Sequence, residues 1–256
     1  MLLVIDVGNT NTVMGLYNEA ALVGSWRLET KKERTSDEMG IFLREILSFS
    51  KYDLTQIQAI AISNVVPTLG YALHEMCERY FHLKPFLVTP DVKSPLKIKL
   101  DNPKEIGADR IVNAVAAHVE HKCDAVIIDF GTATTFDVVS QDGDYLGGAI
   151  CPGINISAEA LFQRASKLPR VEIAKPNHTI GRNTIECMQS GLYYGYIGLV
   201  DELVTRLAAE FGKKLFVIAT GGLASVIAKD SKTIDKVDDL LTLKGLKFLY
   251  EQSLTA

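Results

Sequence analysis

The chain has 256 residues, of which 47% are apolar and 23% are charged, as is typical of a folded globular protein. Its 27 basic and 31 acidic residues give a net charge of −4, and the basic run from Lys31 to Arg34 is interrupted by Glu33. This balance argues against nucleic acid as the main partner, because binding to a phosphate backbone normally requires a basic patch. The length suits two domains of about 100–150 residues each.

Neither the cysteines nor the N-terminus indicates a secreted or membrane protein. The first residues reach Asp6 after a short apolar run and include no basic segment, unlike a signal peptide or a membrane span. No Cys-x-x-Cys pair and no Cys/His cluster with zinc spacing occurs among the four cysteines, Cys77, Cys123, Cys151 and Cys187. We therefore expect a cytoplasmic protein with reduced thiols and no membrane contact.

The first half of the chain alternates between predicted strands and helices. Two short runs of branched apolar residues flank the polar turn Asp6-Val-Gly-Asn-Thr-Asn-Thr12. Thr35 and Glu38 have the spacing of a capping box, and Asn102-Pro103 resembles a second helix entry. The predicted elements are the strands Leu2–Ile5, Val13–Tyr17 and Gln58–Ser63, and helices from Thr35 to about Phe49 and from Ile106 to Val119.

The second half repeats this pattern at an offset of 123 residues. The shift lays Asp6, Gly8 and Thr12 on Asp129, Gly131 and Thr135, and it carries Leu22-Val-Gly24 onto Tyr145-Leu-Gly147. A helix is predicted from about Thr184 to Phe211, and the strand Lys214–Ala219 resembles the strand Gln58–Ser63. One offset that matches a strand, a turn and a third-strand glycine indicates two copies of one unit. Strands that alternate with helices place both copies in the α/β class.

The polar turn after Asp6 has two interpretations. One is a simple hairpin turn, for which Asn and Gly are favoured in any case. The other is a phosphate site, in which backbone N–H groups and hydroxyls bind phosphate oxygens and Asp6 holds hydrated Mg²⁺. The second copy at Asp129 favours the phosphate site, because a cleft between duplicated domains is a natural nucleotide site. Neither a P-loop nor a GxGxxG fingerprint occurs in the sequence.

The run Gly107-Ala-Asp109-Arg110 also has two interpretations, which the sequence leaves open. Asp109 and Arg110 are an exposed ion pair of little consequence, or Asp109 accepts a proton from a substrate hydroxyl while Arg110 binds anionic oxygens. Thr220-Gly-Gly222 is a weaker signal, in which the glycines would let adenine or ribose approach the backbone. His118 and His121 have a spacing compatible with one metal ion, but we expect them on a solvated helix face.

Together these motifs resemble the superfamily of actin, Hsp70 and the sugar kinases. The strand before Asp6-x-Gly8-x-Thr10, its copy at Asp129-Phe-Gly-Thr132 and the later Thr220-Gly-Gly222 carry that resemblance. Within the superfamily the chain looks most like type III pantothenate kinases, over nearly its whole length. The motifs of this closer resemblance are Asp6-Val-Gly-Asn-Thr-Asn11, Thr35-Ser-Asp-Glu38, Asp101-Asn-Pro-Lys-Glu-Ile-Gly-Ala-Asp-Arg-Ile111, Asp129-Phe-Gly-Thr-Ala-Thr-Thr135, Gly147-Gly-Ala-Ile-Cys-Pro-Gly153, Leu168-Pro169, Ile180-Gly-Arg-Asn-Thr184 and Gln189-Ser-Gly191.

The resemblance implies two duplicated ribonuclease H-like (actin-like) domains, each with a mixed β-sheet and flanking helices. The first would span residues 1–116, with the first phosphate loop and the substrate motif. The second would span residues 117–256, with the second phosphate and cation loop and the adenosine-side motif. The resemblance also implies a homodimeric kinase that transfers the γ-phosphate of ATP to the primary alcohol of pantothenate, the first step of coenzyme A synthesis.

The same resemblance assigns roles to individual residues. Asp109 would be the catalytic base, Asp129 would bind a monovalent cation such as K⁺ or NH₄⁺, and Asp6 would hold Mg²⁺ through water. ATP would contact Asp6, Val7, Gly8, Asn9, Thr10, Asn11, Thr12, Val13 and Thr132. Pantothenate would contact Gly107, Ala108, Asp109, Arg110 and Thr184.

Two other functions remain open. A nucleotide-binding regulator without kinase activity is one, although the presence of Asp6, Asp109, Arg110 and Asp129 argues against a dead enzyme. A kinase of another small hydroxylated metabolite is the second. Leu100 is the sequence hint for it, because many members of the family carry a tyrosine there that contacts pantothenate. A leucine still covers apolar atoms, but it cannot donate the hydrogen bond of a hydroxyl.

Overall fold

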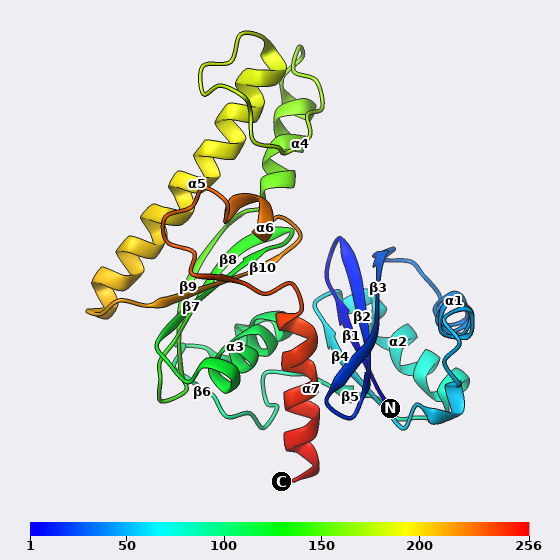
Figure 1. The fold of residues 1–256 in the computed structure, drawn as a ribbon. Helices are drawn as coiled ribbons and strands as arrows, with labels where there is room; N and C mark the ends of the chain where they lie inside the picture. The colour runs from blue at the N-terminus through cyan, green and yellow to red at the C-terminus, as the bar shows by residue number, and fades with distance from the viewer. Residues whose placement is uncertain (256) are drawn as a thin grey trace. The chain divides into compact units, whose positions relative to one another are not determined.

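The computed structural model describes residues 1–255, which form two compact units (Figure 1). Unit 1 comprises residues 1–95, 102–119 and 241 onward, and unit 2 comprises residues 96–101 and 120–240. The division inside the chain falls between residues 119 and 120, whereas the prediction placed it at 116/117, and two segments are assigned differently. Residues 96–101 join unit 2 because β6 (Lys97–Ile98) pairs with a strand of that unit. The C-terminal helix α7 (Leu241–Leu254) joins unit 1 because it packs on β1 and β4.

Unit 1 contains a five-stranded sheet in the order β3-β2-β1-β4-β5. The central strand β1 is antiparallel to β2 and parallel to β4. The predicted capping box at Thr35 and Glu38 is present at the start of α1. The elements are β1 (Leu2–Val7), β2 (Asn11–Asn18), β3 (Ala21–Glu29), α1 (Ser36–Phe49), β4 (Ala59–Asn64), α2 (Gly70–Met76), β5 (Phe86–Leu87), α3 (Ala108–His121) and α7.

The two faces of this sheet bury different kinds of side chain. On one face, the branched residues Leu3 and Ile5 pack in a core with Leu43 of α1 and other residues of α1 and α2. On the other face small residues allow α7 to lie close, since a Cβ on Gly15 would be 3.0 Å from the side chain of Leu243. Alternation of this kind is what period-two side chains of strands buried on both faces require.

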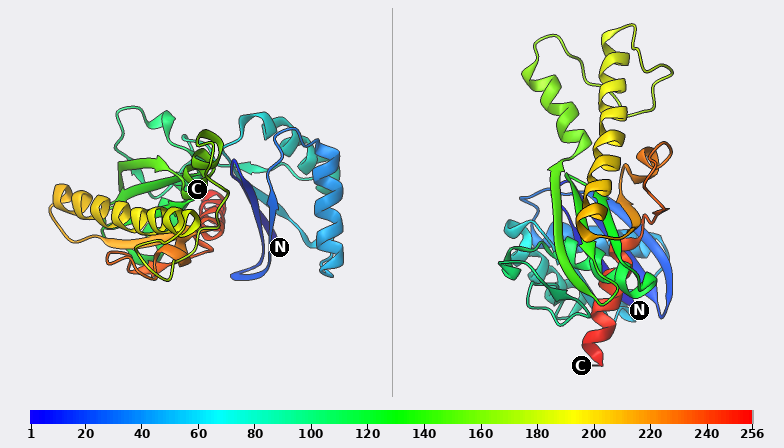
Figure 2. Two further views of the ribbon diagram at one scale, coloured as in Figure 1. Left: turned by 90° about the horizontal axis from the view of Figure 1, so that it is seen from above. Right: turned by 90° about the vertical axis from the view of Figure 1, so that its left-hand side faces the viewer.

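Unit 2 contains a six-stranded sheet in the order β11-β10-β7-β8-β9-β6. Its core joins β7 and β10 to the middle of α5, from Leu192 to Val204. Helix α4 and the N-terminal half of α5 continue beyond the sheet as an arm of residues 154–190 (Figure 1; Figure 2, right). The elements are β7 (Ala125–Phe130), β8 (Ala133–Val139), β9 (Asp144–Pro152), α4 (Ile154–Arg164), α5 (Thr184–Phe211), β10 (Phe216–Gly221), α6 (Ala224–Ile227) and β11 (Lys236–Val237).

Strand pairing confirms the predicted duplication. The order β3-β2-β1-β4-β5 recurs in unit 2 as β9-β8-β7-β10-β11, and both third strands carry a bulge at the equivalent place. The glycines Gly24 and Gly147, which the sequence offset matched, both flank that bulge. This repeated mixed sheet with flanking helices is the predicted pair of ribonuclease H-like domains.

The pairing corrects one detail of the offset. Val7 pairs with Thr12 in unit 1, whereas Phe130 pairs with Thr134 in unit 2. The turn of unit 2 is therefore one residue shorter, and Thr12 corresponds to Thr134 rather than to Thr135. A sequence offset cannot detect this change, because both positions hold threonine.

The predicted limits agree with the structure for one long helix and differ for another. Helix α5 has the predicted limits, and it ends at Gly212, whose φ of +82° is a conformation that favours glycine. The helix predicted from Ile106 begins later, at Ala108, because residues 103–105 form a separate 3₁₀ turn after Asn102. Within residues 1–255, no helix combines the length and the apolar character that crossing a membrane requires.

Candidate functional site

The turn between β1 and β2 is held by backbone hydrogen bonds. The N–H of Gly8 donates to the carbonyl of Asn11 (3.0 Å), and the N–H of Thr30 donates to the carbonyl of Thr10 (2.9 Å). The hydroxyls of Thr12 and Thr30 lie 2.8 Å apart, which braces the turn against the connection from β3 to α1. Residues 9 and 10 at the tip are exposed. The predicted segment Asp6–Val13 is thus one ordered turn with an accessible tip, as a phosphate nest requires.

Asp6 lies at the carboxyl edge of the unit 1 sheet. It pairs in register with Val13 of β2 and with Ser63 of β4. Because β1 and β4 are parallel, they end at the same edge, and the side chains of Asp6 and Ser63 leave the sheet on the same face. Just beyond β4, the N–H of Val65 donates to the carbonyl of Val7 (3.1 Å) and keeps the two strand ends together.

The segment Gly107–Arg110 lies beside this edge, within unit 1. A Cβ on Gly107 would be 3.8 Å from the side chain of Val65 and only 2.5 Å from Oδ1 of Asp109, so a larger residue here would displace that carboxylate. Asp109 is in the first turn of α3, where its Oδ1 accepts the N–H of Arg110 at 2.8 Å. Ala108 is buried beneath them. The structure therefore brings the predicted base to the same sheet edge as Asp6.

The second turn places Asp129 among glycines. The N–H of Gly131 donates to the carbonyl of Ala133 (3.1 Å), and a Cβ on Gly131 would be 3.5 Å from Oδ1 of Asp129. Gly221 of β10 has a φ of +91°, and a Cβ there would lie 2.6 Å from the same oxygen. The first glycine of Thr220-Gly-Gly222 thus makes room for the carboxylate of Asp129. The sequence had suggested that these glycines make room for adenine or ribose.

Thr132 is fixed by the start of the arm. Its carbonyl accepts the N–H of Gly153 at 3.1 Å, and a Cβ on Gly153 would be 2.3 Å from that oxygen. Thr184 lies elsewhere in unit 2: it is the exposed first residue of α5, after Asn183 as cap, at the far end of the arm (Figure 1). Within this unit the structure does not bring Thr184 together with Asp129 and Thr132.

The residues present fit Mg²⁺ bound together with ATP. No group of three or more His, Cys, Asp and Glu side chains in residues 1–255 could hold a metal ion by itself. Mg²⁺ in kinases keeps several waters and is bound through one or two carboxylates and the substrate phosphates. Asp6, half-buried beside an accessible polar turn, provides such a carboxylate.

The two histidines of α3 are less exposed than expected. His118 and His121 are both half-buried, and the ring of His121 packs on that of Phe216 with centroids 5.1 Å apart. The prediction of a solvated face is therefore wrong for these residues. Leu100, the departure noted in the sequence, is half-buried in unit 2, and its Cδ2 would be 3.1 Å from a Cβ on Gly147.

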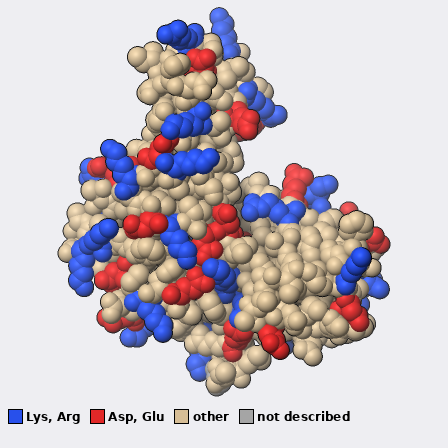
Figure 3. Space-filling view, in the orientation of Figure 1, with Lys and Arg blue, Asp and Glu red and all other residues tan. Residues whose placement is uncertain are grey.

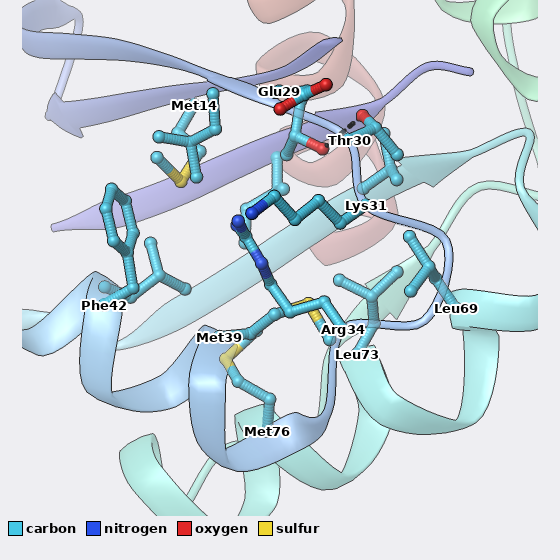
Figure 4. Close-up of a pocket in the computed structure, with 15 residues that line it drawn as sticks. Met14, Glu29, Thr30, Lys31, Arg34, Met39, Phe42, Leu69, Leu73 and Met76 are labelled. Atoms are coloured by element: carbon cyan, nitrogen blue, oxygen red, sulfur yellow. Dashed lines mark hydrogen bonds between the residues drawn. The ribbon is translucent and has the colours of Figure 1, made fainter. Parts of the chain in front are cut away.

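An apolar cavity lies next to the first turn, beneath the connection from β3 to α1 (Figure 4). Met14, Phe42 and Leu73 contribute to its walls, and Lys31 and Arg34 extend over it. The guanidinium of Arg34 lies 5.9 Å from the centre of the Phe42 ring. The cavity has a volume of ≈ 30 Å³, which suits about one water molecule, so the cavity is too small for a nucleotide or for pantothenate.

Two hydroxyl residues beside the predicted carboxylates were not among the predicted site residues. Ser63 is 0% exposed and pairs with Asp6, and Thr220 is 2% exposed and pairs with Asp129. Both end an apolar strand, which was visible in the sequence. Their position beside a carboxylate depends on strand register, which the sequence did not reveal.

Comparison with known proteins agrees with this geometry. The profile of the family described as type III pantothenate kinase matches residues 2–206. A type III pantothenate kinase of Myxococcus xanthus is 55% identical over 250 residues, which cover 98% of each chain. One of Pelobacter propionicus is 56% identical over 253 residues, which cover 99% of this chain and 100% of the relative.

A solved structure shows the same fold at lower identity. A Campylobacter jejuni protein described as a member of the Baf family of transcriptional activators has a TM-score of 0.61 and 20% identity, with 99% of this chain and 100% of that chain covered. The profile match and the relatives at 55% and 56% identity both extend over most of the sequence. The chain belongs to the type III pantothenate kinase family.

Proposed function

We propose that this protein transfers the γ-phosphoryl group of ATP to the primary hydroxyl of pantothenate, which yields 4′-phosphopantothenate and ADP. The family supports this reaction, and one structural observation carries it. Gly107 lies against Val65, and the backbone N–H of Val65 donates a hydrogen bond to the carbonyl of Val7 at the end of β1. The segment that contains Asp109 therefore borders the first phosphate turn. A base and a phosphate-binding turn at one sheet edge are what transfer to an alcohol requires.

In the proposed reaction, the hydroxyl oxygen of pantothenate bonds to the γ-phosphorus while the bond from that phosphorus to the β–γ bridging oxygen breaks. ADP leaves with the bridging oxygen, and the hydroxyl proton passes to the carboxylate of Asp109. Proton transfer is late in a loose transition state, so a carboxylate of ordinary basicity suffices. Arg110 would bind the anionic oxygens of the substrate, for which its planar guanidinium is suited.

Each turn has its own role in this proposal. The N–H groups and hydroxyls of residues 6–13 hold the phosphates, and Thr132 contacts the nucleotide. Mg²⁺, bound with ATP and held by Asp6 through water, would neutralise charge on the phosphate oxygens. Asp129, whose Oδ1 lies close to Gly131 and Gly221, would bind a monovalent cation such as K⁺ or NH₄⁺.

Helix α5 and the arm of unit 2 support a homodimer. Three glycines inside α5, Gly191, Gly195 and Gly198, are exposed and have no atom within 4 Å of a hypothetical Cβ. A glycine inside a helix costs about 1 kcal/mol relative to alanine, and glycines spaced in this way let another backbone approach closely. Large exposed apolar side chains gather on β9 and on the arm, namely Leu146, Ile150, Ile156, Leu161, Phe162, Ile180 and Ile185.

We propose that a second copy of the chain binds to this apolar surface of β9 and the arm, because a two-fold dimer is the simplest assembly that buries the same surface on both copies. A dimer would also give the isolated Thr184 a role, since it could contact substrate bound to the partner. On the face shown in Figure 3, basic and acidic residues are interspersed, which gives no support to a nucleic-acid partner. The free cysteines fit a cytoplasmic location.

The direct test of the reaction is ADP release from Mg²⁺·ATP with and without pantothenate, in parallel KCl and NaCl buffers. We expect release that depends on pantothenate and is faster in KCl, because the cation at Asp129 takes part in binding the nucleotide. Release with other small alcohols but not with pantothenate would move the activity to another metabolite. Tight ATP binding without turnover on any alcohol would favour the regulator.

The variant Asp109→Asn tests the base. It keeps an oxygen that can accept the N–H of Arg110, so we expect an unchanged melting temperature and unchanged binding of Mg²⁺·ATP. We expect kcat to fall by roughly 10²–10⁴-fold, the usual contribution of a general base. Glu105→Gln, which changes an exposed acid of the same segment, should keep normal turnover. Normal turnover of Asp109→Asn would show that another group accepts the proton.

The variant Gly195→Leu tests the dimer by light scattering after size exclusion. The wild type should elute as two copies of a 28.1 kDa chain. The leucine has room in a single chain and favours the helix, so we expect a folded monomer, because the side chain blocks the approach of the partner. Ala209→Leu, an exposed position later in α5, should remain dimeric. A monomeric wild type, or a dimer that survives Gly195→Leu, would contradict the proposal.

A further inference from the structure

Ser63 carries a buried hydroxyl for which the folded chain supplies no hydrogen-bond partner. The residue is 0% exposed, and its Oγ has neither a donor nor an acceptor within hydrogen-bond distance. A buried hydroxyl in this state destabilises the folded protein, because it has lost its bonds to water and gained none. Such groups are rare in folded proteins, so each calls for an explanation.

The position of Ser63 suggests what that explanation is. Ser63 and Asp6 are register partners on adjacent parallel strands, about 4.8 Å apart, and their side chains leave the sheet on the same face. The other residues of β4 on this face, Ala59 and Ala61, are small and apolar, and β4 packs against α7. An alanine at position 63 would continue that pattern without loss. The one hydroxyl on this face of β4 is the one beside the carboxylate.

Unit 2 has an equivalent arrangement. Thr220 of β10 pairs in parallel register with Asp129 of β7, and it is 2% exposed. The strands β4 and β10 have otherwise different residues, Ala-Ile-Ala-Ile-Ser-Asn and Phe-Val-Ile-Ala-Thr-Gly. A hydroxyl next to the central aspartate is therefore a feature that both copies share.

We propose that Ser63 is a positioning residue for Asp6, whose carboxylate accepts the Ser63 hydroxyl when Mg²⁺·ATP is bound. This inference rests on the Mg²⁺ role proposed for Asp6. Rotation about χ1 of either side chain can bring the hydroxyl to the carboxylate across adjacent strands. One carboxylate oxygen is then fixed by Ser63, and the other is directed toward the water shell of the metal, as outer hydrogen bonds orient metal ligands.

The proposal predicts opposite effects of a Ser63 variant on thermal stability without and with ligand. A purely structural role for Ser63 would not produce this pattern. Without ligand, Ser63→Ala removes an unsatisfied group and should raise the melting temperature by about 2–4 °C. With Mg²⁺·ATP, the same variant should gain less stability than the wild type, because the bond to Asp6 cannot form. We expect the Mg²⁺ concentration that half-saturates this variant to rise about tenfold. A change of this size corresponds to the loss of one hydrogen bond to a charged group.

The experiment is thermal unfolding of the full chain without ligand, with ATP and EDTA, and with ATP and Mg²⁺. Ser63→Cys, which keeps the volume but donates weakly, should follow Ser63→Ala. The matched control is Ser36→Ala, since Ser36 is also buried in unit 1 but donates to Glu75 at 2.7 Å. It should melt at a lower temperature and keep the full Mg²⁺ effect.

The outcomes distinguish this inference from the function on which it rests. A lower melting temperature for ligand-free Ser63→Ala, or an undiminished Mg²⁺ effect in both Ser63 variants, would overturn the positioning role while the kinase assignment stands. A wild type that Mg²⁺ does not stabilise beyond ATP with EDTA would instead overturn the Mg²⁺ role of the first turn, and the role of Ser63 with it.

Discussion

The parallel pairing of β1 with β4 is the constraint on which the first half of the site depends. It ends both strands at one edge, places Asp6 beside Ser63, and holds Val65 where the Gly107 segment packs against it. A slip of one residue in this pairing would turn the side chain of Asp6 toward the opposite face, where Ile5 belongs to the core. The apolar alternation that stabilises the sheet therefore also fixes the direction of the carboxylate.

The two units share this plan and differ at the residue that follows the hydroxyl. In unit 1 it is Asn64, whose side chain accepts the N–H of Val66 at 2.9 Å and closes the chain into a turn. In unit 2 it is Gly221, where a Cβ would lie 2.6 Å from Oδ1 of Asp129. The turn of unit 2 is also one residue shorter. Duplication followed by such local changes can account for the two different ion sites that we propose.

Local features of the fold could be predicted from the sequence, and long-range ones could not. The capping box of α1 and the limits of α5 follow from nearby residues, and the paired turns followed from one offset. The return of α7 to unit 1 depends on contacts such as that of Leu243 with Gly15, far apart in the chain. Candidate site residues such as Asp109 were found through a family resemblance. Ser63 was not, because only the register of two strands reveals its neighbour.

In the proposed function, equivalent aspartates of the two units bind different ions. The most direct measurement is an anomalous difference map from crystals grown with Mg²⁺, a non-hydrolysable ATP analogue, and Tl⁺ in place of K⁺. The account predicts a Tl⁺ peak in contact with the carboxylate of Asp129 and none at Asp6, where weaker density for hydrated Mg²⁺ should lie. A Tl⁺ peak at Asp6, or no peak at Asp129, would contradict it.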